Sequence, residues 1–242
     1  MKIKIAVVLV TFFVIISACK KSSLFSGAKI NTLNNYSPGA GFSETFTYNS
    51  NGTVATQQKN NGVKIVYYYS GNTVTMATVN GLGQTTSATE YILNSSGYAD
   101  SSQGQFIAQH NSGAFSYDAN GNWTQVKAYV DHNLNSTDNY TNNSAKNVVE
   151  IQHINASGGT TYDYLTYFTS NNNSIGVQNM GQYYLGVSSA NLVHTDIQIG
   201  VNLDTTDVIT YRYRYDGSGN VDTMVAYHRN GTLADSITYT YY

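Results

Sequence analysis

Few residues in this chain of 242 amino acids have the types and spacing that catalysis needs. His194 and Asp196 lie two positions apart, so on a β-strand both side chains project from the face opposite Val193. A hydrolase could use such a His–carboxylate pair, but no nucleophile motif such as Gly-x-Ser-x-Gly accompanies it. The pattern therefore favours two exposed polar residues on an alternating strand, with a hydrolase as the alternative.

A second group of residues matches part of a calcium-binding loop. Asp131, Asn133 and Asn135 stand at the first three ligand positions. Ser136, however, replaces the glycine of that loop, and Asn142 replaces its glutamate. The five histidines are scattered, with no pair at the spacing of zinc ligands. We therefore expect no cofactor, and we retain Asp131, Asn133 and Asn135 as candidate ligands of a weak calcium site, with a polar loop as the alternative.

Aromatic side chains offer a different kind of site. The chain contains 22 tyrosines and one tryptophan, Trp123, which directly follows a turn motif. Aromatic rings on a curved sheet can stack on sugar rings, and nearby Asn and Asp side chains can bind hydroxyl groups. We therefore take Trp123, Tyr129 and Tyr213 as candidate contacts to a glycan or a peptide. The alternative is that they fill the interior of a β-domain that has few Leu and Ile residues.

The composition excludes one class of partner and favours one class of fold. Charged residues make up 11% of the chain, against about 25% in an average globular protein, and 12 basic residues face 14 acidic ones. Because there is no basic stripe, we expect no nucleic acid partner. Threonine and tyrosine suit a pleated, half-buried surface, whereas asparagine and glycine suit turns, so the sequence predicts an all-β fold.

One unit recurs from Phe42 onward: an alternating strand, a short polar turn that contains glycine, and another alternating strand. Each turn begins with Asn or Asp, whose side chain can bond to the backbone two residues later, and it ends with Gly, which readily adopts a left-handed conformation. This order is typical of a type I turn followed by a glycine bulge. The sequence therefore predicts a single domain over 42–242, an antiparallel β-meander of hairpins curved into an open or partly closed barrel. The clearest turns are 48–52, 93–97, 117–121 and 215–219.

The alternation also places individual elements. Residues 171–190 show no clean period, so we expect a long loop or a short helix there. The last hairpin can be registered from its apolar pattern. Its expected pairs are Tyr215 with Val221, Tyr211 with Val225 and Arg214 with Asp222. The other expected strands are 42–48, 63–69, 73–79, 87–93, 123–130, 147–154, 160–168, 192–201 and 233–241.

The N-terminus has the layout of a secretory signal. Lys2 and Lys4 precede an unbroken run of apolar or small residues from Ile5 to Ile16, which is too short to span a bilayer as a helix. Ser17-Ala18-Cys19 then resembles the lipobox of bacterial lipoproteins, in which the cysteine is lipidated and becomes the first residue of the mature chain. The alternative is an ordinary signal peptide with an incidental cysteine.

These features divide the chain into three parts. We expect a signal peptide at 1–18, a lipidated Cys19 with a flexible tether at 19–41, and the β-meander domain at 42–242. A flexible segment of about 22 residues spans roughly 25 Å, so the domain should lie close to the membrane.

The repeated turns carry a more specific resemblance. Tyr117 to Asn122 and Tyr215 to Asn220 share the order Tyr-Asp-x-x-Gly-Asn and look like the YD repeats of Rhs-type β-meanders. The last third of the chain includes an Asn-rich irregular segment at 171–181, then Leu185-Gly186 and a strand ending in Tyr239-Thr240-Tyr241. It resembles a family of Bacteroidota lipoproteins of unknown function with a porin-like, curved β-meander fold. That resemblance implies a fold and a location in the cell envelope, but no activity.

The residues after the cysteine bear on that location. Surface-exported lipoproteins of this bacterial group usually carry acidic residues there, whereas Lys20 and Lys21 follow Cys19 in this chain. We therefore expect the periplasmic face of the outer membrane ahead of the cell surface. Most of the expected strands are shorter than the ~9–11 residues that cross a bilayer, which favours attachment through the lipid. The expected function is that of a non-enzymatic envelope protein, either a binding module for a glycan or peptide or a structural partner, with an envelope hydrolase and an outer-membrane pore as alternatives.

Overall fold

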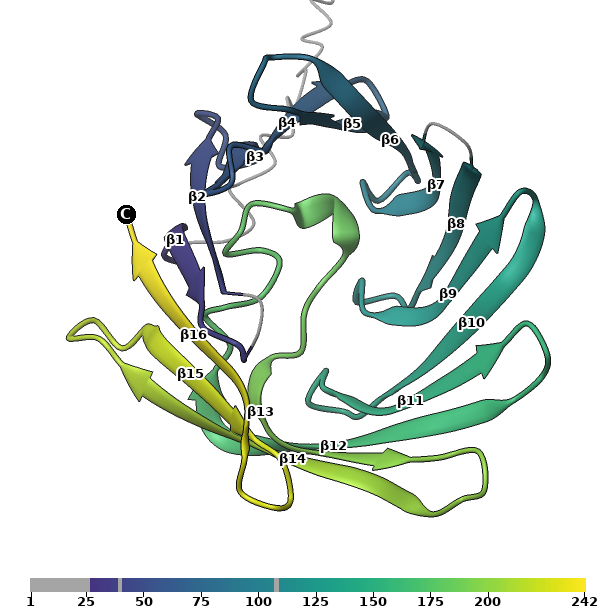
Figure 1. Ribbon diagram of the computed structural model, residues 1–242, viewed down its shortest axis with the longest axis vertical. Coiled ribbons are helices and arrows are strands. Elements are labelled where there is room, and N and C mark those ends of the chain that lie inside the picture. Colours follow the sequence, from purple (N-terminus) through teal and green to yellow (C-terminus); the bar gives the residue numbers. More distant parts are fainter. Residues whose placement is uncertain (1–26, 39–40, 107–108) are drawn as a thin grey trace, which may run out of the picture.

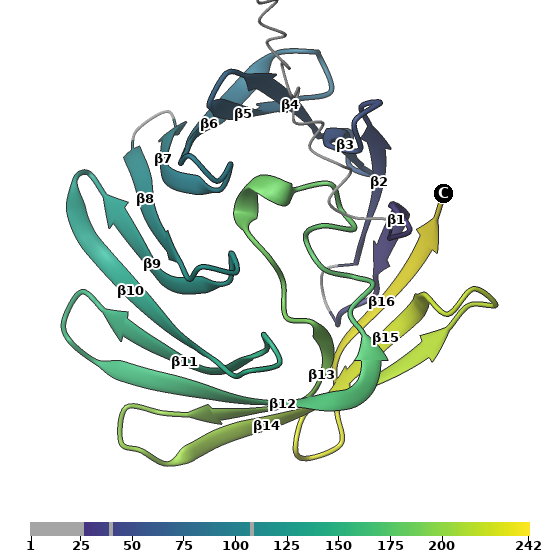
Figure 2. The same cartoon turned by 180° about the vertical axis from the view of Figure 1, so that it is seen from behind.

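The computed structural model describes residues 27–38, 41–106 and 109–242, which form one closed β-barrel (Figure 1, Figure 2). Each strand pairs with the strands before and after it in the chain, and β1 pairs with β16 to close the ring. The expected all-β, antiparallel meander is therefore confirmed, and the sheet is fully closed. The expected signal peptide and Cys19 lie outside the described residues.

Sixteen strands and one short 3₁₀-helix, η1, make up this part of the chain. No helix within it has the length and apolar character needed to cross a membrane. The elements are β1 (Ile30–Asn35), β2 (Phe42–Tyr48), β3 (Val54–Lys59), β4 (Lys64–Ser70), β5 (Thr73–Val79), β6 (Thr85–Leu93), β7 (Ala99–Phe106), β8 (Gln109–Tyr117), β9 (Trp123–Val130), β10 (Asn133–Asn142), β11 (Val148–Asn155), β12 (Thr160–Asn172), η1 (Tyr183–Leu185), β13 (Asn191–Ile199), β14 (Thr205–Tyr215), β15 (Val221–Tyr227) and β16 (Leu233–Tyr241).

The hairpin turns form as their residue types predict. In the turn between β8 and β9, Asp118 Oδ1 accepts a hydrogen bond from the backbone N–H of Asn122 at 3.0 Å. The backbone N–H of Gly121 donates to the Asp118 carbonyl oxygen at 3.1 Å, and Gly121 has a φ of 86°. This is the left-handed conformation that glycine adopts without steric cost. The strand register shifts directly beside the turn, as expected for a glycine bulge.

The last hairpin confirms one part of the expected register and corrects another. Tyr215 pairs with Val221, as expected. Farther from the turn, Tyr211 pairs with Ala226, so the expected pairing with Val225 is wrong. The bulge places one extra residue in β15, and each pair beyond it is displaced by one position.

The extra residue in this bulge is Asp222. The cross-strand partner of Arg214 is Thr223, so the expected pairing of Arg214 with Asp222 is also displaced. The Arg214 Nε nevertheless lies 2.8 Å from Asp222 Oδ1, because the long guanidinium side chain reaches its neighbour across the bulge.

Part of the expected tether belongs to the barrel. Ile30–Asn35 forms β1, which pairs with β16 on one side and β2 on the other. Ile30 is fully buried and Leu33 is 7% exposed. The segment reads Ile-Asn-Thr-Leu-Asn-Asn, which lacks a period of two, so its strand conformation depends on the two sheet edges that it joins.

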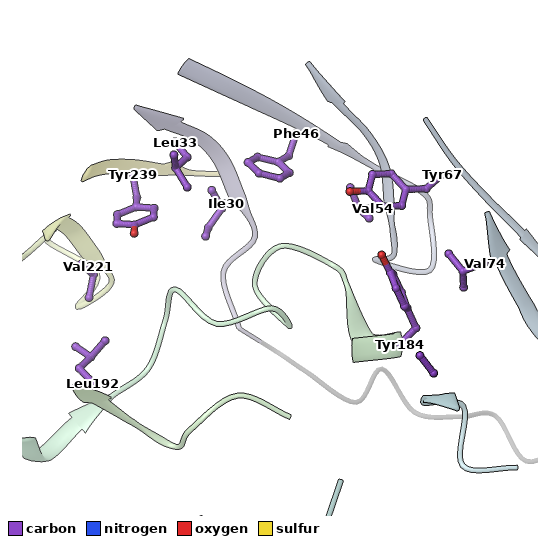
Figure 3. Close-up of a cluster of buried hydrophobic side chains, with 11 residues drawn as sticks. Ile30, Leu33, Phe46, Val54, Tyr67, Val74, Tyr184, Leu192, Val221 and Tyr239 are labelled. Carbon is purple, nitrogen blue, oxygen red and sulfur yellow. The ribbon is translucent and has the colours of Figure 1, made fainter. Parts of the chain in front are cut away.

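Residues 173–190, between β12 and β13, fold back into the ring (Figure 1, Figure 2). We call this segment the plug; it is the expected long loop with a short helix. Tyr184 of η1 is 4% exposed, and its ring centroid lies 5.0 Å from that of Tyr91. Figure 3 shows Tyr184 beside Tyr67 and Val74 of the barrel wall. The plug therefore completes the hydrophobic core.

The two faces of the sheet differ in character. The exposed threonines Thr47 and Thr56 face each other with their hydroxyl oxygens 2.7 Å apart. Asn139 accepts a hydrogen bond from Gln125 at 2.8 Å and donates one to Gln152 at 2.9 Å. These groups lie on the outer face, which also carries Tyr162 and Tyr164, whereas most of the buried apolar side chains lie on the inner face. The buried apolar residues are Ile30, Leu33, Phe46, Val54, Tyr67, Val74, Ala77, Ala99, Tyr184, Leu192, Val221, Ala226 and Tyr239.

Candidate functional site

A cavity of about 780 Å³ lies beside the plug. This volume is within the range of roughly 300–1,000 Å³ that small-ligand sites occupy. Its walls come from the two ends of the plug, the end of β12 and the turn between β14 and β15. Amide and hydroxyl side chains dominate its lining. They include Asn171, Asn172, Asn173, Ser188, Ser189 and Tyr215.

Asn171 and Tyr215 both line this cavity and bond to each other. Asn171 Nδ2 donates a hydrogen bond to the Tyr215 hydroxyl at 2.6 Å, and this bond fixes the direction of the ring. Tyr215 is 38% exposed, so part of its ring is open to a ligand. Asn173 Nδ2 donates to the Ser189 carbonyl oxygen at 3.0 Å and ties the two ends of the plug together. An exposed aromatic ring among amides and hydroxyls can bind a polar ring that carries hydroxyl groups.

Two glycines allow the plug to approach the barrel wall. The Gly181 carbonyl oxygen accepts a hydrogen bond from the Val54 backbone N–H at 3.1 Å. Gly186 has a φ of 86°, and a Cβ added there would lie 2.6 Å from Cε1 of Tyr117. No other residue fits at such a distance, so these glycines hold the plug and the adjoining cavity in place.

A separate group of charged side chains lies on the inner face, around His153. Its Nδ1 lies 2.8 Å from Asp138 Oδ1, and its Nε2 lies 3.0 Å from Asp163 Oδ2. Because both ring nitrogens face carboxylate oxygens, the protonated imidazolium form of His153 can donate to both, and this geometry favours that form. Burial acts to lower the pKa of His153, but the hydrogen bonds and charges of Asp163 and Asp138 outweigh burial and raise it. A second imidazole, that of His228, pairs with Asp207 through its Nδ1 alone.

The structure corrects one part of the His194–Asp196 interpretation. Asp196 is only 8% exposed, so the expected exposure of this residue is wrong. Its Oδ2 accepts a hydrogen bond from Gln198 at 3.3 Å, and burial together with the Asp163 charge raises its pKa. His194 is exposed as expected, and its ring packs against Phe168 at 4.6 Å. The two side chains therefore lie in different environments.

The three aromatic candidates do not meet at one site. Trp123 packs edge-to-face against Tyr140 at 5.5 Å. Tyr213 packs edge-to-face against Phe168 at 5.9 Å, and burial raises its pKa. Tyr129 points outward, because it is three residues from Val126, which lies opposite the core residue Phe115. Roles for Trp123, Tyr129 and Tyr213 in ligand binding stay predictions.

The candidate calcium ligands lie in a tight hairpin between β9 and β10. Asp131 and His132 have φ values of 47° and 67°, as in a two-residue type I′ turn. Asp131 Oδ1 accepts a hydrogen bond from the His110 backbone N–H at 3.0 Å, and Asn133 Nδ2 donates to the Asp131 carbonyl oxygen at 3.1 Å. Asn135 follows in β10, at a shift in register. The calcium site stays a prediction.

Sequence reasoning did not find the cavity beside the plug. The available signal was the run Asn171-Asn172-Asn173 at the start of a segment without a period. Tyr215, however, is 44 residues from Asn171 in sequence, and the two meet because β12 and β14 flank β13 in the sheet. Contacts across a third strand do not appear in local residue patterns.

The barrel is similar to two solved structures of porin-like proteins. One, from Bacteroides uniformis ATCC 8492, matches with a TM-score of 0.67 and 18% sequence identity over 89% of this chain and 98% of the other. Another, from Bacteroides vulgatus ATCC 8482, has a TM-score of 0.61 and 11% identity over 89% of this chain and 99% of the other. No protein-family model and no curated protein matches the chain. The expected porin-like fold is therefore confirmed, while membership of the lipoprotein family and the YD repeats stay predictions.

Proposed function

We propose that this protein is a lipid-anchored β-barrel of the cell envelope that binds a glycan in the cavity beside the plug. The observation that carries the proposal is the lining of that cavity, where amide and hydroxyl side chains surround the partly exposed ring of Tyr215. Glycans offer many hydroxyl groups for hydrogen bonding and flat C–H faces for stacking on an aromatic ring. No step of this proposal requires a cofactor or a nucleophile.

The proposed location rests on the N-terminal sequence and on the place where the chain enters the barrel. Gly27 and Ala28 line the same cavity, so the described part of the chain begins beside it. A flexible segment of about eight residues, as between Cys19 and Gly27, spans roughly 16 Å. The cavity would then face the membrane that holds the lipid. Lys20 and Lys21 favour the periplasmic face of the outer membrane over the cell surface.

An outer-membrane pore is the second candidate, and the likeness to porin-like proteins favours it. Two observations argue against an open pore that spans a bilayer. A transmembrane barrel carries an apolar band about 25 Å tall on its outer face, whereas threonine pairs such as Thr47–Thr56 and the amides of Gln125, Asn139 and Gln152 lie on the outer face here. The plug, with the buried Tyr184, also occupies the interior. We therefore favour a water-exposed barrel that is held by its lipid.

Binding can be tested with the mature chain carrying Cys19→Ser, which should be soluble without detergent. A thermal-shift screen against glycans detects a ligand, because a compound that binds only the folded state raises the melting temperature. For a glycan found in this way, Tyr215→Ala should weaken binding about tenfold, equivalent to about 1.4 kcal/mol. Asn171→Ala should weaken it less, because the amide orients the ring and contributes one polar contact.

Tyr68→Ala is the matched control, because Tyr68 is a 57% exposed tyrosine in β4, away from the cavity. The control should bind the glycan with unchanged affinity. An equal loss in Tyr68→Ala, or no shift with a broad panel of glycans, would contradict the proposal. A Cys19→Ser chain that stays in solution only with detergent would favour the pore.

A further inference from the structure

A group of carboxylates lies on the inner face of the barrel, away from the cavity beside the plug. Asp163 of β12 and Asp207 of β14 are both cross-strand partners of Gln198 in β13, so the three residues share one face. Asp196 lies two residues before Gln198 and projects from that face as well. Asp235 of β16 lies on the same side, because its carboxylate bonds to the buried Asn35 at 3.0 Å.

Most of these carboxylates have partners of their own. Asp163 pairs with His153, and Asp207 pairs with His228 and accepts a hydrogen bond from the Arg229 backbone N–H. Asp235 accepts hydrogen bonds from Asn35 and Ser37. Asp207 and Asp235 therefore have at least two hydrogen-bond partners each, and imidazoles lie beside Asp163 and Asp207.

Asp196 differs from the others. It is 8% exposed, yet its Oδ1 has no hydrogen-bond partner among the described residues, and its Oδ2 has only the long bond from Gln198 at 3.3 Å. A buried carboxylate oxygen without a partner is unfavourable, and such an atom is often completed by a bound group. The group that completes Asp196 must donate hydrogen bonds, and positive charge would favour it further because Asp163 is near.

Tyr211 connects three of these carboxylates. Burial raises the pKa of Tyr211 to about 12, and the negative charges of Asp196, Asp235 and Asp163 contribute to this increase. In the sheet, Asp196 pairs with Ile209, two residues before Tyr211. Tyr211 pairs with Ala226, which pairs with Asp235, so Asp196 and Asp235 lie on either side of the phenol.

We propose that Asp196 binds the protonated amine of a ligand, with Asp163 and Tyr211, its diagonal neighbours in the sheet, as further acceptors. An ammonium group has three N–H donors and can bond to acceptors that are several ångströms apart. A metal ion would need ligands packed around one point, and the part of the chain that the structure describes contains no group of three His, Cys, Asp or Glu side chains that could hold one. The ligand class is therefore an organic amine, either a free polyamine or a lysine-bearing peptide.

Titration calorimetry at low ionic strength tests this proposal, with spermidine and a lysine tripeptide as separate probes and the mature Cys19→Ser chain as the protein. We expect saturable binding of at least one probe and a tenfold or greater loss of affinity in Asp196→Asn. Asp222→Asn is the matched control, since it makes the same change of charge at a carboxylate that pairs with Arg214 outside this group. The control should bind with unchanged affinity.

Melting temperatures distinguish ligand binding by Asp196 from a merely structural role. Asp196→Asn removes a buried charge, so we expect a higher melting temperature without ligand and a loss of the further increase that spermidine causes. Tyr211→Phe removes one oxygen and should weaken binding severalfold, which provides a second variant if Asp196→Asn does not fold. Unchanged affinity in both variants would overturn the proposal. An equal loss of affinity in Asp222→Asn would also overturn it, as would saturable calcium binding that spermidine does not displace.

Discussion

His153 lies between two carboxylates, so the stability of the protein should depend on whether its imidazole is protonated. Its pKa is raised above the ordinary value of 6.5, so folding favours the protonated form. The contribution of its ion pairs to stability is therefore fully present below about pH 6.5, and it is lost as the pH rises through the pKa of the folded state. We expect His153→Gln to lower the melting temperature more at about pH 5.5 than at about pH 8.5.

Solvent limits the size of this effect. The side chains of His153, Asp138 and Asp163 are 38%, 28% and 23% exposed, so we expect a difference of about 1 kcal/mol or less between the two pH values. His194→Gln is the control, because His194 is exposed and packs against the ring of Phe168. Equal pH dependence in the two variants would show that the carboxylates beside His153 do not favour its protonated form.

At the scale of elements, the position of the plug depends on a glycine. Gly186 has a φ of 86° and a ψ of −152°, a conformation that other residues essentially do not adopt. A Cβ there would also lie 2.7 Å from the Gly121 carbonyl oxygen. We expect Gly186→Ala to destabilise the protein by about 1–3 kcal/mol or more, measured by denaturant unfolding, and to weaken glycan binding in the adjoining cavity.

Gly217→Ala is the matched control for this prediction. Gly217 lies in the turn between β14 and β15, and a Cβ added there would have no atom within 4 Å. We expect a change in stability of less than about 1 kcal/mol, with either sign. If Gly186→Ala and Gly217→Ala change stability equally, the close packing of the plug against the wall does not contribute to stability.

Elements differ in how far their own residues specify them. Strands with alternating apolar residues, such as β5 and β16, match the expected ranges, because their pattern is local. β7 and β10 were not expected, since Ser, Gln and Asn fill both faces and leave no period of two. The cavity could not be predicted from local residue patterns either, because Asn171 and Tyr215 meet only after β12, β13 and β14 have paired.

The closure of the whole barrel depends on one polar strand. A chain that begins at residue 42, the boundary that the alternation predicts, lacks β1 and leaves the edges of β2 and β16 unpaired. Unpaired edges invite pairing with other chains, and the loss of the fully buried Ile30 would uncover the core. We expect this chain to aggregate, whereas a chain that begins at Gly27 should be a folded monomer by light scattering and circular dichroism. If the shorter chain were monomeric with an unchanged melting temperature, β1 would not be needed to close the sheet, and the boundary at 42 would stand.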